Sequence, residues 1–138
     1  MQFTKKLAII SRSPDVLNIK ERMPGKMSIV IATRSAGKFL VVEVKGRIGG
    51  ESSIEFYRTA KEILSDCVES DIIIDFSQVD FIDSSGLGSL VAINSHLVKN
   101  DRRLILSGVM DSLMGLLKIT NLISILTIVK TVEDALQR

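Results

Sequence analysis

The 138-residue chain has no tryptophan, one tyrosine and five phenylalanines, so aromatic side chains make up only 4% of it. Aromatic rings are the platforms on which proteins stack single-stranded nucleic acid. The formal net charge is +2, which is too small to indicate an electrostatic attraction to a phosphate backbone. We therefore expect no nucleic-acid partner.

Cysteine is nearly absent as well. Cys67 is the single cysteine, so it cannot form an internal disulfide, and its isolation is consistent with a reducing compartment. It falls on the apolar stripe of a predicted helix, which favours a small core residue over the alternative, a reactive thiol.

Long hydrophobic runs are missing too. The longest early run covers residues 7–10, which is shorter than the roughly 7–15 apolar residues at the centre of a signal peptide. No segment approaches the roughly 20 residues of a membrane span. We expect a cytoplasmic protein with no membrane span.

The first 26 residues differ from the rest of the chain. Six lysines and arginines stand there against Asp15 and Glu21, so this segment carries +4 and the remainder carries −2. Ser13-Pro14 and Pro24-Gly25 interrupt it. We interpret residues 1–26 as a basic, loosely ordered N-terminal extension, with a basic arm for a partner or a membrane surface as the alternative. Residues 27–138 form the domain.

From residue 28 onward, apolar runs and helical stripes alternate. Strands are expected over residues 29–32, 39–44, 72–74, 104–106 and 125–129, and helices over 86–99, 111–118 and 132–137. A further helix carries the stripe Phe56, Ala60, Ile63, Leu64 and Cys67. A turn is expected over 35–38 and a loop over 46–50. The spacing of Ser52 and Glu55, and that of Thr131 and Asp134, predicts two helix-capping boxes. This order predicts a single α/β domain with helices covering a mixed, mostly parallel sheet.

The stretch DFIDSSGLGSL, from Asp80 to Leu90, begins as the end of a buried strand and finishes as the start of a helix. Asp83 or Ser84 can cap that helix by accepting a hydrogen bond from a free N–H, a contribution of about 1 kcal/mol. One cap does not require three successive polar residues, so Ser85 needs another explanation.

A serine nucleophile is one explanation to weigh. The nucleophile elbow requires G-x-S-x-G, but Asp83 stands two residues before Ser85. The only histidine, His96, lies eleven residues further along the same predicted helix, about 16 Å along its axis. Gly86 and Gly88 form only part of a dinucleotide-binding pattern, since Val91 takes the third glycine position. The residues indicate no enzyme and no cofactor.

The predicted helix after Asp83 has two contrasting sides. The expected core side comprises Leu87, Leu90, Val91, Asn94, Leu97 and Val98, and the expected solvent side comprises Ser85, Gly88, Ser89, Ala92, Ser95 and Lys99. Side chains this short would allow another protein's backbone to approach closely, unless the pattern is a coincidence of small polar residues.

The stretch from Asp75 to Gly88, DFSQVDFIDSSGLG, closely resembles the signature of STAS domains, particularly bacterial anti-sigma factor antagonists. The resemblance in element order covers residues 28–138. It implies phosphorylation at Ser85, within a turn formed by Asp83, Ser84 and Gly86, by a partner serine kinase that is also the anti-sigma factor. It also implies resetting by a PPM-type phosphatase.

On this interpretation the unmodified protein binds the kinase through a surface comprising Ser85, Leu87, Gly88, Ser89, Ala92 and Ser95. Phosphorylation adds about −1.5 to −2 charges, which a helix N-terminus tolerates but a docked partner does not. The kinase, and not this chain, holds the ATP.

One position departs from the family pattern. Members often carry an acidic residue after the second strand, where this chain has Gly49, and this weakens the transfer of any partner contact from that loop. The alternative function is a STAS subunit or scaffold of a stress-signalling or lipid-transport assembly that has no phosphorylation cycle.

Overall fold

The computed structural model describes residues 9–10 and 29–138. Within them, one six-stranded sheet has the order β1-β2-β3-β4-β5-β6. The strands are β1 (Ile9–Ile10), β2 (Ile29–Ala36), β3 (Phe39–Ile48), β4 (Asp71–Ile82), β5 (Arg103–Ser107) and β6 (Thr127–Val129). The β2–β3 pair is antiparallel and the other four neighbouring pairs are parallel. The predicted mixed, mostly parallel sheet is confirmed.

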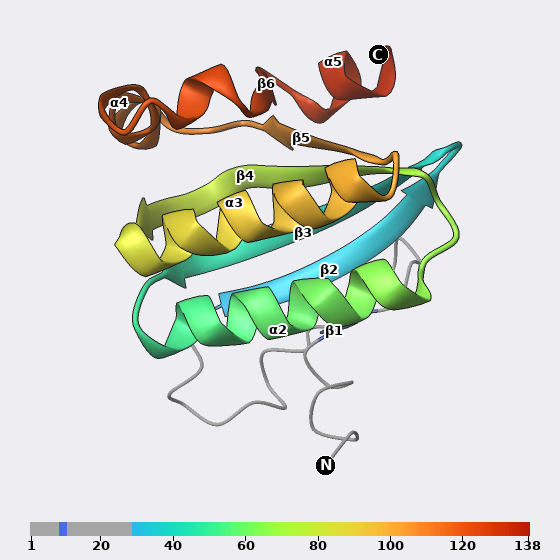
Figure 1. Ribbon diagram of the computed structural model, residues 1–138, viewed down its shortest axis with the longest axis horizontal. Helices are drawn as coiled ribbons and strands as arrows, with labels where there is room; N and C mark the ends of the chain where they lie inside the picture. The colour runs from blue at the N-terminus through green and yellow to red at the C-terminus, as the bar shows by residue number, and fades with distance from the viewer. Residues whose placement is uncertain (1–8, 11–28) are drawn as a thin grey trace.

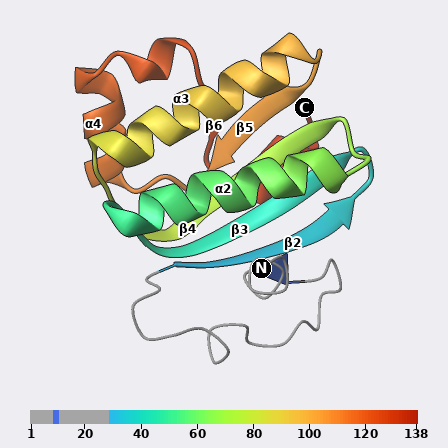
Figure 2. The ribbon, with the colours of Figure 1, turned by 60° about the horizontal axis from the view of Figure 1, so that its bottom comes forward.

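Helices cover both faces of this sheet. They are α2 (Glu51–Asp66), α3 (Ser84–Lys99), α4 (Asp111–Ile119) and α5 (Val132–Leu136), with the short 3-10 helix η2 (Leu122–Ser124) between α4 and β6. Helices α2 and α3 lie side by side across one face (Figures 1 and 2), and α4 adds Leu113 and Leu117 to the same core. On the opposite face, α5 packs Val132 and Ala135 on the sheet.

The central strand β4 divides the core between the two faces. Ile72 and Ile74 pack in the core beneath α2 and α3, whereas Ile73 packs with α5. Alternate residues of a strand point to opposite faces, so a strand covered on both faces has to be apolar at successive positions. The predicted strand over residues 72–74 is confirmed, and each fully buried isoleucine contributes about 1.5–3 kcal/mol.

The β2–β3 hairpin is tighter than the predicted turn. Both strands continue to a two-residue turn at Gly37 and Lys38, where Gly37 has a φ of +64°. Strand β3 also continues through Gly46 to Ile48, since its backbone stays paired with β4 across two irregularities in register. The predicted loop over residues 46–50 is therefore shortened to Gly49 and Gly50.

The predicted capping box at Ser52 and Glu55 is wrong. Helix α2 begins earlier, because Gly50 is its N-cap residue with a φ of +56°. Ser52 already lies in the first turn, where its Oγ donates to the Arg47 carbonyl at 2.6 Å and accepts from the Gly49 N–H at 2.8 Å. Ser52 thus ties the end of β3 to the helix. At the other end of the domain, the Thr131 cap is confirmed, with Oγ1 accepting from the Asp134 N–H at 3.0 Å.

Helix α3 is rotated relative to the predicted core side. Ile93 is fully buried, although the predicted core side omits it, and Val98 is 59% exposed. The buried residues of α3 are Gly86, Leu87, Leu90, Ile93 and Leu97. Contact with α2 as well as the sheet turns this helix so that Ile93 replaces Val98 in the core.

Cys67 lies just beyond α2, as its C-cap residue, and not on the helical stripe as predicted. Its side chain is half-buried at the margin of the core. Arg102 Nη2 lies 2.9 Å from the sulfur and donates to the Glu69 carbonyl at 2.7 Å. Cys67 therefore contributes to a polar junction at the end of the helix.

The predicted N-terminal extension lies outside the described residues except for β1, whose two residues pair with Ile31 and Ala32 of β2. In the described part of the chain, no helix combines the length and apolar character needed to cross a membrane.

Candidate functional site

The N-termini of α2 and α3 meet at one edge of the sheet (Figure 1). Parallel strands β3 and β4 end side by side there, with Ile48 paired to Ile82. Each strand passes directly into a helix, through Gly49 and Gly50 in the first case and through Asp83 in the second. The topology therefore brings the serine turn after β4 next to the first turn of α2.

Asp83 is the cap of α3, and Ser84 is not. Asp83 has extended backbone dihedral angles, and its Oδ1 accepts from the Gly86 N–H at 2.9 Å. Its other oxygen, Oδ2, accepts from the Gly50 N–H at 3.0 Å. A single carboxylate thus satisfies backbone donors at the starts of two helices, each of which would otherwise lack a partner.

Ser85 is exposed and its hydroxyl is held in place. Its Oγ donates to Asp83 Oδ1 at 2.6 Å and lies 2.7 Å from the Oγ of Ser53 in α2. The pKa of Asp83 is lowered, first by this Ser85 hydroxyl and then by the Gly86 N–H, with the Gly50 N–H adding to the effect, while desolvation opposes it. The carboxylate is consequently an ionised acceptor at neutral pH and a weak base.

Two glycines allow the backbone to come this close. A Cβ on Gly86 would lie 2.5 Å from Ile82 Cγ1 and 2.9 Å from the Ile48 carbonyl oxygen. A Cβ on Gly49 would lie 2.9 Å from both Asp83 Oδ2 and Phe81 Cε2. These contacts leave no room for a side chain at either position without movement of its neighbours.

The contact at Gly49 gives a physical reason for the departure from the family pattern. An acidic residue there would enter the space that the Asp83 carboxylate and the Phe81 ring occupy. The Arg47 guanidinium stacks on that ring at 4.3 Å from its centroid.

The predicted partner surface is mostly accessible, with one correction. Ser85, Gly88 and Ser95 are exposed, and Ser89 and Ala92 are half-buried on α3, which lies beside α2. Leu87 is wrong as a partner-binding residue, because its side chain is 6% exposed and packs in the core. We call the remaining predicted residues, Ser85, Gly88, Ser89, Ala92 and Ser95, the docking face.

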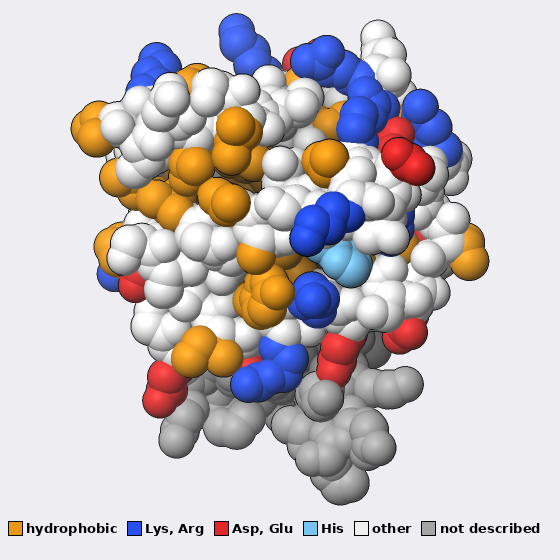
Figure 3. Space-filling view, viewed as in Figure 1, with side chains coloured by type: hydrophobic (Ala, Val, Ile, Leu, Met, Phe, Trp, Pro, Cys, Tyr) orange, Lys and Arg blue, Asp and Glu red, His pale blue; other side chains and the backbone are white. Residues whose placement is uncertain are grey.

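Charged side chains are scarce on this face. The sequence of α3 contains no Asp or Glu, and its first Lys or Arg is Lys99 at the far end of the helix. In Figure 3 the blue Lys and Arg side chains gather toward that end, and uncharged white and orange atoms cover most of the rest of α3. The side chains of the docking face are therefore short and uncharged, and the charge beside Ser85 is that of the Asp83 carboxylate.

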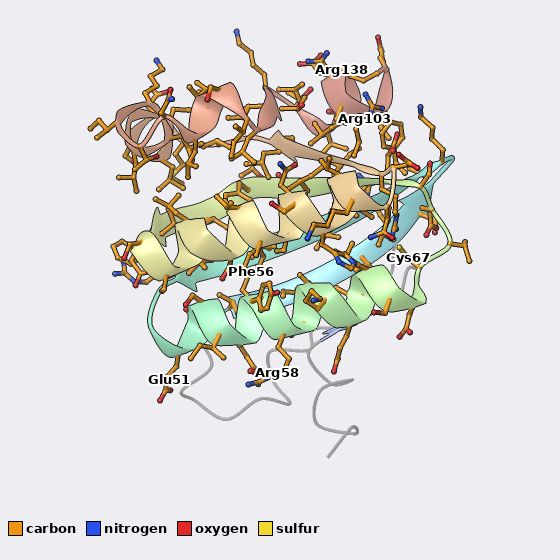
Figure 4. All side chains as sticks on the ribbon, in the orientation of Figure 1. Glu51, Phe56, Arg58, Cys67, Arg103 and Arg138 are labelled. Carbon is orange, nitrogen blue, oxygen red and sulfur yellow. The ribbon has the colours of Figure 1, made fainter. Side chains whose placement is uncertain are left out.

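One residue of α2 belongs to this site and was missed in the sequence. Ser53 is buried and its Oγ contacts that of Ser85. Figure 4 shows how α2 divides its contacts: Phe56 points toward α3, whereas Glu51 and Arg58 project away from it. No local signal marks Ser53, since its role depends on a residue 32 positions further along the chain.

Within residues 29–138, the serine turn has no histidine or metal-binding cluster beside it. His96 lies on α3 near its C-terminal end, three turns from Ser85. No group of three or more His, Cys, Asp or Glu side chains in residues 29–138 is placed to hold a metal ion. A pocket of about 610 Å³ lies between α4, η2 and β6 and is lined by none of the residues of the serine turn.

Comparison with known proteins adds to this geometry. Residues 30–135 match the STAS domain family. The anti-sigma-B factor antagonist of Staphylococcus aureus is 32% identical over 99 residues, which cover 70% of this chain and 88% of that protein.

Solved structures share the fold. An anti-sigma factor antagonist from Mycobacterium paratuberculosis aligns with a TM-score of 0.73 and 24% identity, over 80% of this chain and 92% of that one. The Bacillus cell fate determinant SpoIIAA in its phosphorylated form aligns with a TM-score of 0.61 and 18% identity, over 79% and 98%. The family match, the curated relative and the shared fold agree: this chain belongs to the STAS domain family.

Proposed function

We propose that the chain is an anti-sigma factor antagonist that binds an anti-sigma serine kinase and is released when Ser85 is phosphorylated. The observation that carries the proposal is the Ser85 hydroxyl, exposed at the start of α3, held by Asp83 and surrounded by the uncharged docking face. The name of the Staphylococcus aureus relative supports the role.

In this reaction the chain is the protein substrate of the kinase. The Ser85 oxygen forms a bond to the γ-phosphorus of ATP held by the kinase, and the bond to the bridging oxygen breaks, leaving its electron pair on ADP. The hydroxyl proton leaves toward Asp83 Oδ1, 2.6 Å away, and passes to water because this carboxylate is a weak base. The chain supplies an oriented nucleophile, and the kinase supplies the catalysis.

The fold tolerates the phosphate. Ser85 lies in the first turn of α3, where the helix dipole and free N–H groups favour negative charge. The modified serine no longer donates to Asp83, but the Gly50 and Gly86 N–H groups still do. The phosphate and the ionised Asp83 repel each other, and these two N–H bonds, which are left in place, are expected to hold the cap that joins the two helices.

A bound partner does not tolerate it. A phosphate carries about −1.5 to −2 charges. It would have to lose its bound water where the partner's surface packs against the small, uncharged side chains of the docking face. A loss of about 2.8 kcal/mol in binding corresponds to a hundredfold weaker affinity. A PPM-type phosphatase would then restore the unmodified hydroxyl.

The alternative is a STAS subunit or scaffold that binds its partner constitutively. Gly49 favours this alternative, because this chain lacks the acidic loop residue common in the family. In that case the same docking face binds a protein, such as the ATPase of a lipid transporter, without any phosphorylation.

The two functions separate in one experiment. A tagged chain is used to recover its partner from its own cells, and the purified partner is incubated with the chain and labelled ATP. We expect a serine kinase, phosphate mapped to Ser85 by mass spectrometry, and no label on Ser85→Ala. Label that persists in Ser85→Ala contradicts the site, and a partner that retains Ser85→Asp with full affinity favours the scaffold.

A further inference from the structure

The hydroxyl of Ser53 faces Ser85 from the first turn of α2. The two Oγ atoms are 2.7 Å apart, and Ser53 is 2% exposed whereas Ser85 is open to solvent. The phosphorylation step described above uses Asp83 and leaves this buried hydroxyl without a role. We infer that Ser53 is a positioning residue for Ser85, an inference that rests on the proposed function.

The available protons fix the direction of the contact. An ionised carboxylate only accepts hydrogen bonds, so the proton between Ser85 Oγ and Asp83 Oδ1 belongs to Ser85. A proton between the two hydroxyl oxygens can then come only from Ser53. The Gly50 carbonyl, 2.8 Å from Ser53 Oγ, competes with Ser85 for this proton. The single Ser53 proton can make a full hydrogen bond to only one of these two acceptors.

This chain of bonds leaves Ser85 prepared for attack. A hydroxyl oxygen has one proton and two lone pairs. The proton points to Asp83, one lone pair faces the Ser53 hydroxyl, and the remaining lone pair is free on an exposed side chain. Successive hydrogen bonds also strengthen one another, so Ser53 adds to the polarisation of the Ser85 hydroxyl.

The same two bonds restrict the rotamer of Ser85. An exposed serine with no partner samples three staggered χ1 wells. Bonds to Ser53 on α2 and to Asp83 at the start of α3 hold the oxygen between the two helices. A nucleophile held in one productive geometry reacts faster than one that must find it.

Ser52 offers a matched control. It is the preceding residue in the same turn of α2, it is also buried, and its hydroxyl makes comparable hydrogen bonds to Arg47 and Gly49. It has no hydrogen bond to Ser85. Ser52→Ala and Ser53→Ala thus each remove one buried hydroxyl from one turn, and only the second removes a bond to the phosphorylation site.

The first test needs no kinase. Three-bond Hα–Hβ couplings of Ser85 are measured by NMR in the full chain and in both alanine variants. We expect one large and one small coupling, or two small ones, in the unmodified chain and in Ser52→Ala, and values shifted toward the average in Ser53→Ala, where only Asp83 still holds the hydroxyl. Couplings in Ser53→Ala that equal those in Ser52→Ala overturn the inference.

The second test uses the serine kinase recovered with the tagged chain. Loss of one ordinary hydrogen bond predicts that Ser53→Ala is phosphorylated about fivefold more slowly, with kcat reduced and KM unchanged, while Ser52→Ala keeps the original kcat. An equal kcat for Ser53→Ala and the unmodified chain, with Ser85 labelled in both, refutes the role of Ser53 and leaves the proposed function intact. Absence of label on the unmodified chain instead refutes the proposed function.

Discussion

The Asp83 carboxylate accepts a hydrogen bond from the Gly50 N–H at 3.0 Å, so one side chain joins the start of α3 to the start of α2. The other oxygen of the same carboxylate accepts from the Gly86 N–H and from Ser85. The residue that presents the serine is thus also the residue that holds the two helices together.

Asp83→Asn is expected to lower stability above pH 5 and to matter less in acid. The pKa of Asp83 is lowered in the folded chain, so the folded state favours the ionised form. The contribution of the ionised carboxylate to the free energy of unfolding is fully present above the pKa of aspartate in the unfolded chain, about 3.9. It is lost as the pH falls through the lower pKa of the folded chain. Urea unfolding from pH 7 down to pH 2 measures the difference between the two proteins.

The control for that series is Asp80→Asn, an exposed aspartate three residues earlier. It should leave both the stability at neutral pH and the shape of the pH profile nearly unchanged. A profile of Asp83→Asn that runs parallel to that of the unmodified chain would show that the carboxylate contributes nothing.

Gly49→Asp is expected to destabilise the chain more at pH 7 than at pH 3. A side chain at this position meets Asp83 Oδ2 and Phe81, and two neighbouring carboxylates repel when both are ionised. Gly49→Asn has nearly the same shape without the charge and serves as the control. Thermal midpoints of both variants at the two pH values test this, and a difference between Asp and Asn that does not change with pH would contradict it.

Gly86→Ala and Gly88→Ala should have opposite effects, although the two residues are two positions apart in one helix. The added methyl at Gly86 meets Ile82 and Ile48, and such overpacking costs about 1–3 kcal/mol. At Gly88 the methyl meets nothing within 4 Å, and alanine is favoured over glycine in a helix by up to about 1 kcal/mol. Chemical denaturation gives both values, and equal losses at the two positions would refute the close approach at Gly86.

Gly88→Arg tests the docking face without touching the serine turn. The long charged side chain would project from the middle of that face and is expected to weaken partner binding at least tenfold, about 1.4 kcal/mol, with little change in stability. Gly115→Arg in α4 is the matched control, because a Cβ there also meets nothing within 4 Å. Equal partner affinities for the two arginine variants would place the interface elsewhere.

Local patterns predicted much of the fold. The run Ile72–Ile74 predicted a strand buried on both faces, and the stripe from Phe56 to Leu64 predicted the buried side of α2. Features set by tertiary contacts were predicted poorly. The spacing of Leu90, Ile93 and Leu97 already places Ile93 on one helical stripe, and the predicted core side wrongly omitted it. The exposure of Val98 depends on how α3 is rotated against α2 and the sheet.

The candidate site was predicted only in part. The polar turn after β4 pointed to Asp83 and Ser85, which the structure brings within hydrogen-bond distance. Ser52 matched the spacing of a capping box, yet the backbone freedom of Gly50 starts the helix earlier and gives Ser52 another partner. Ser53 and the contact that requires Gly49 come from elements that meet only in three dimensions.

The most direct measurement is the affinity of the purified partner kinase for two forms of the chain, unmodified and carrying phosphoserine at position 85, by isothermal titration calorimetry. The account predicts binding at least about a hundredfold weaker for the phosphorylated form, together with an unchanged circular dichroism spectrum. Equal affinities for the two forms, or loss of the folded spectrum on phosphorylation, would contradict it.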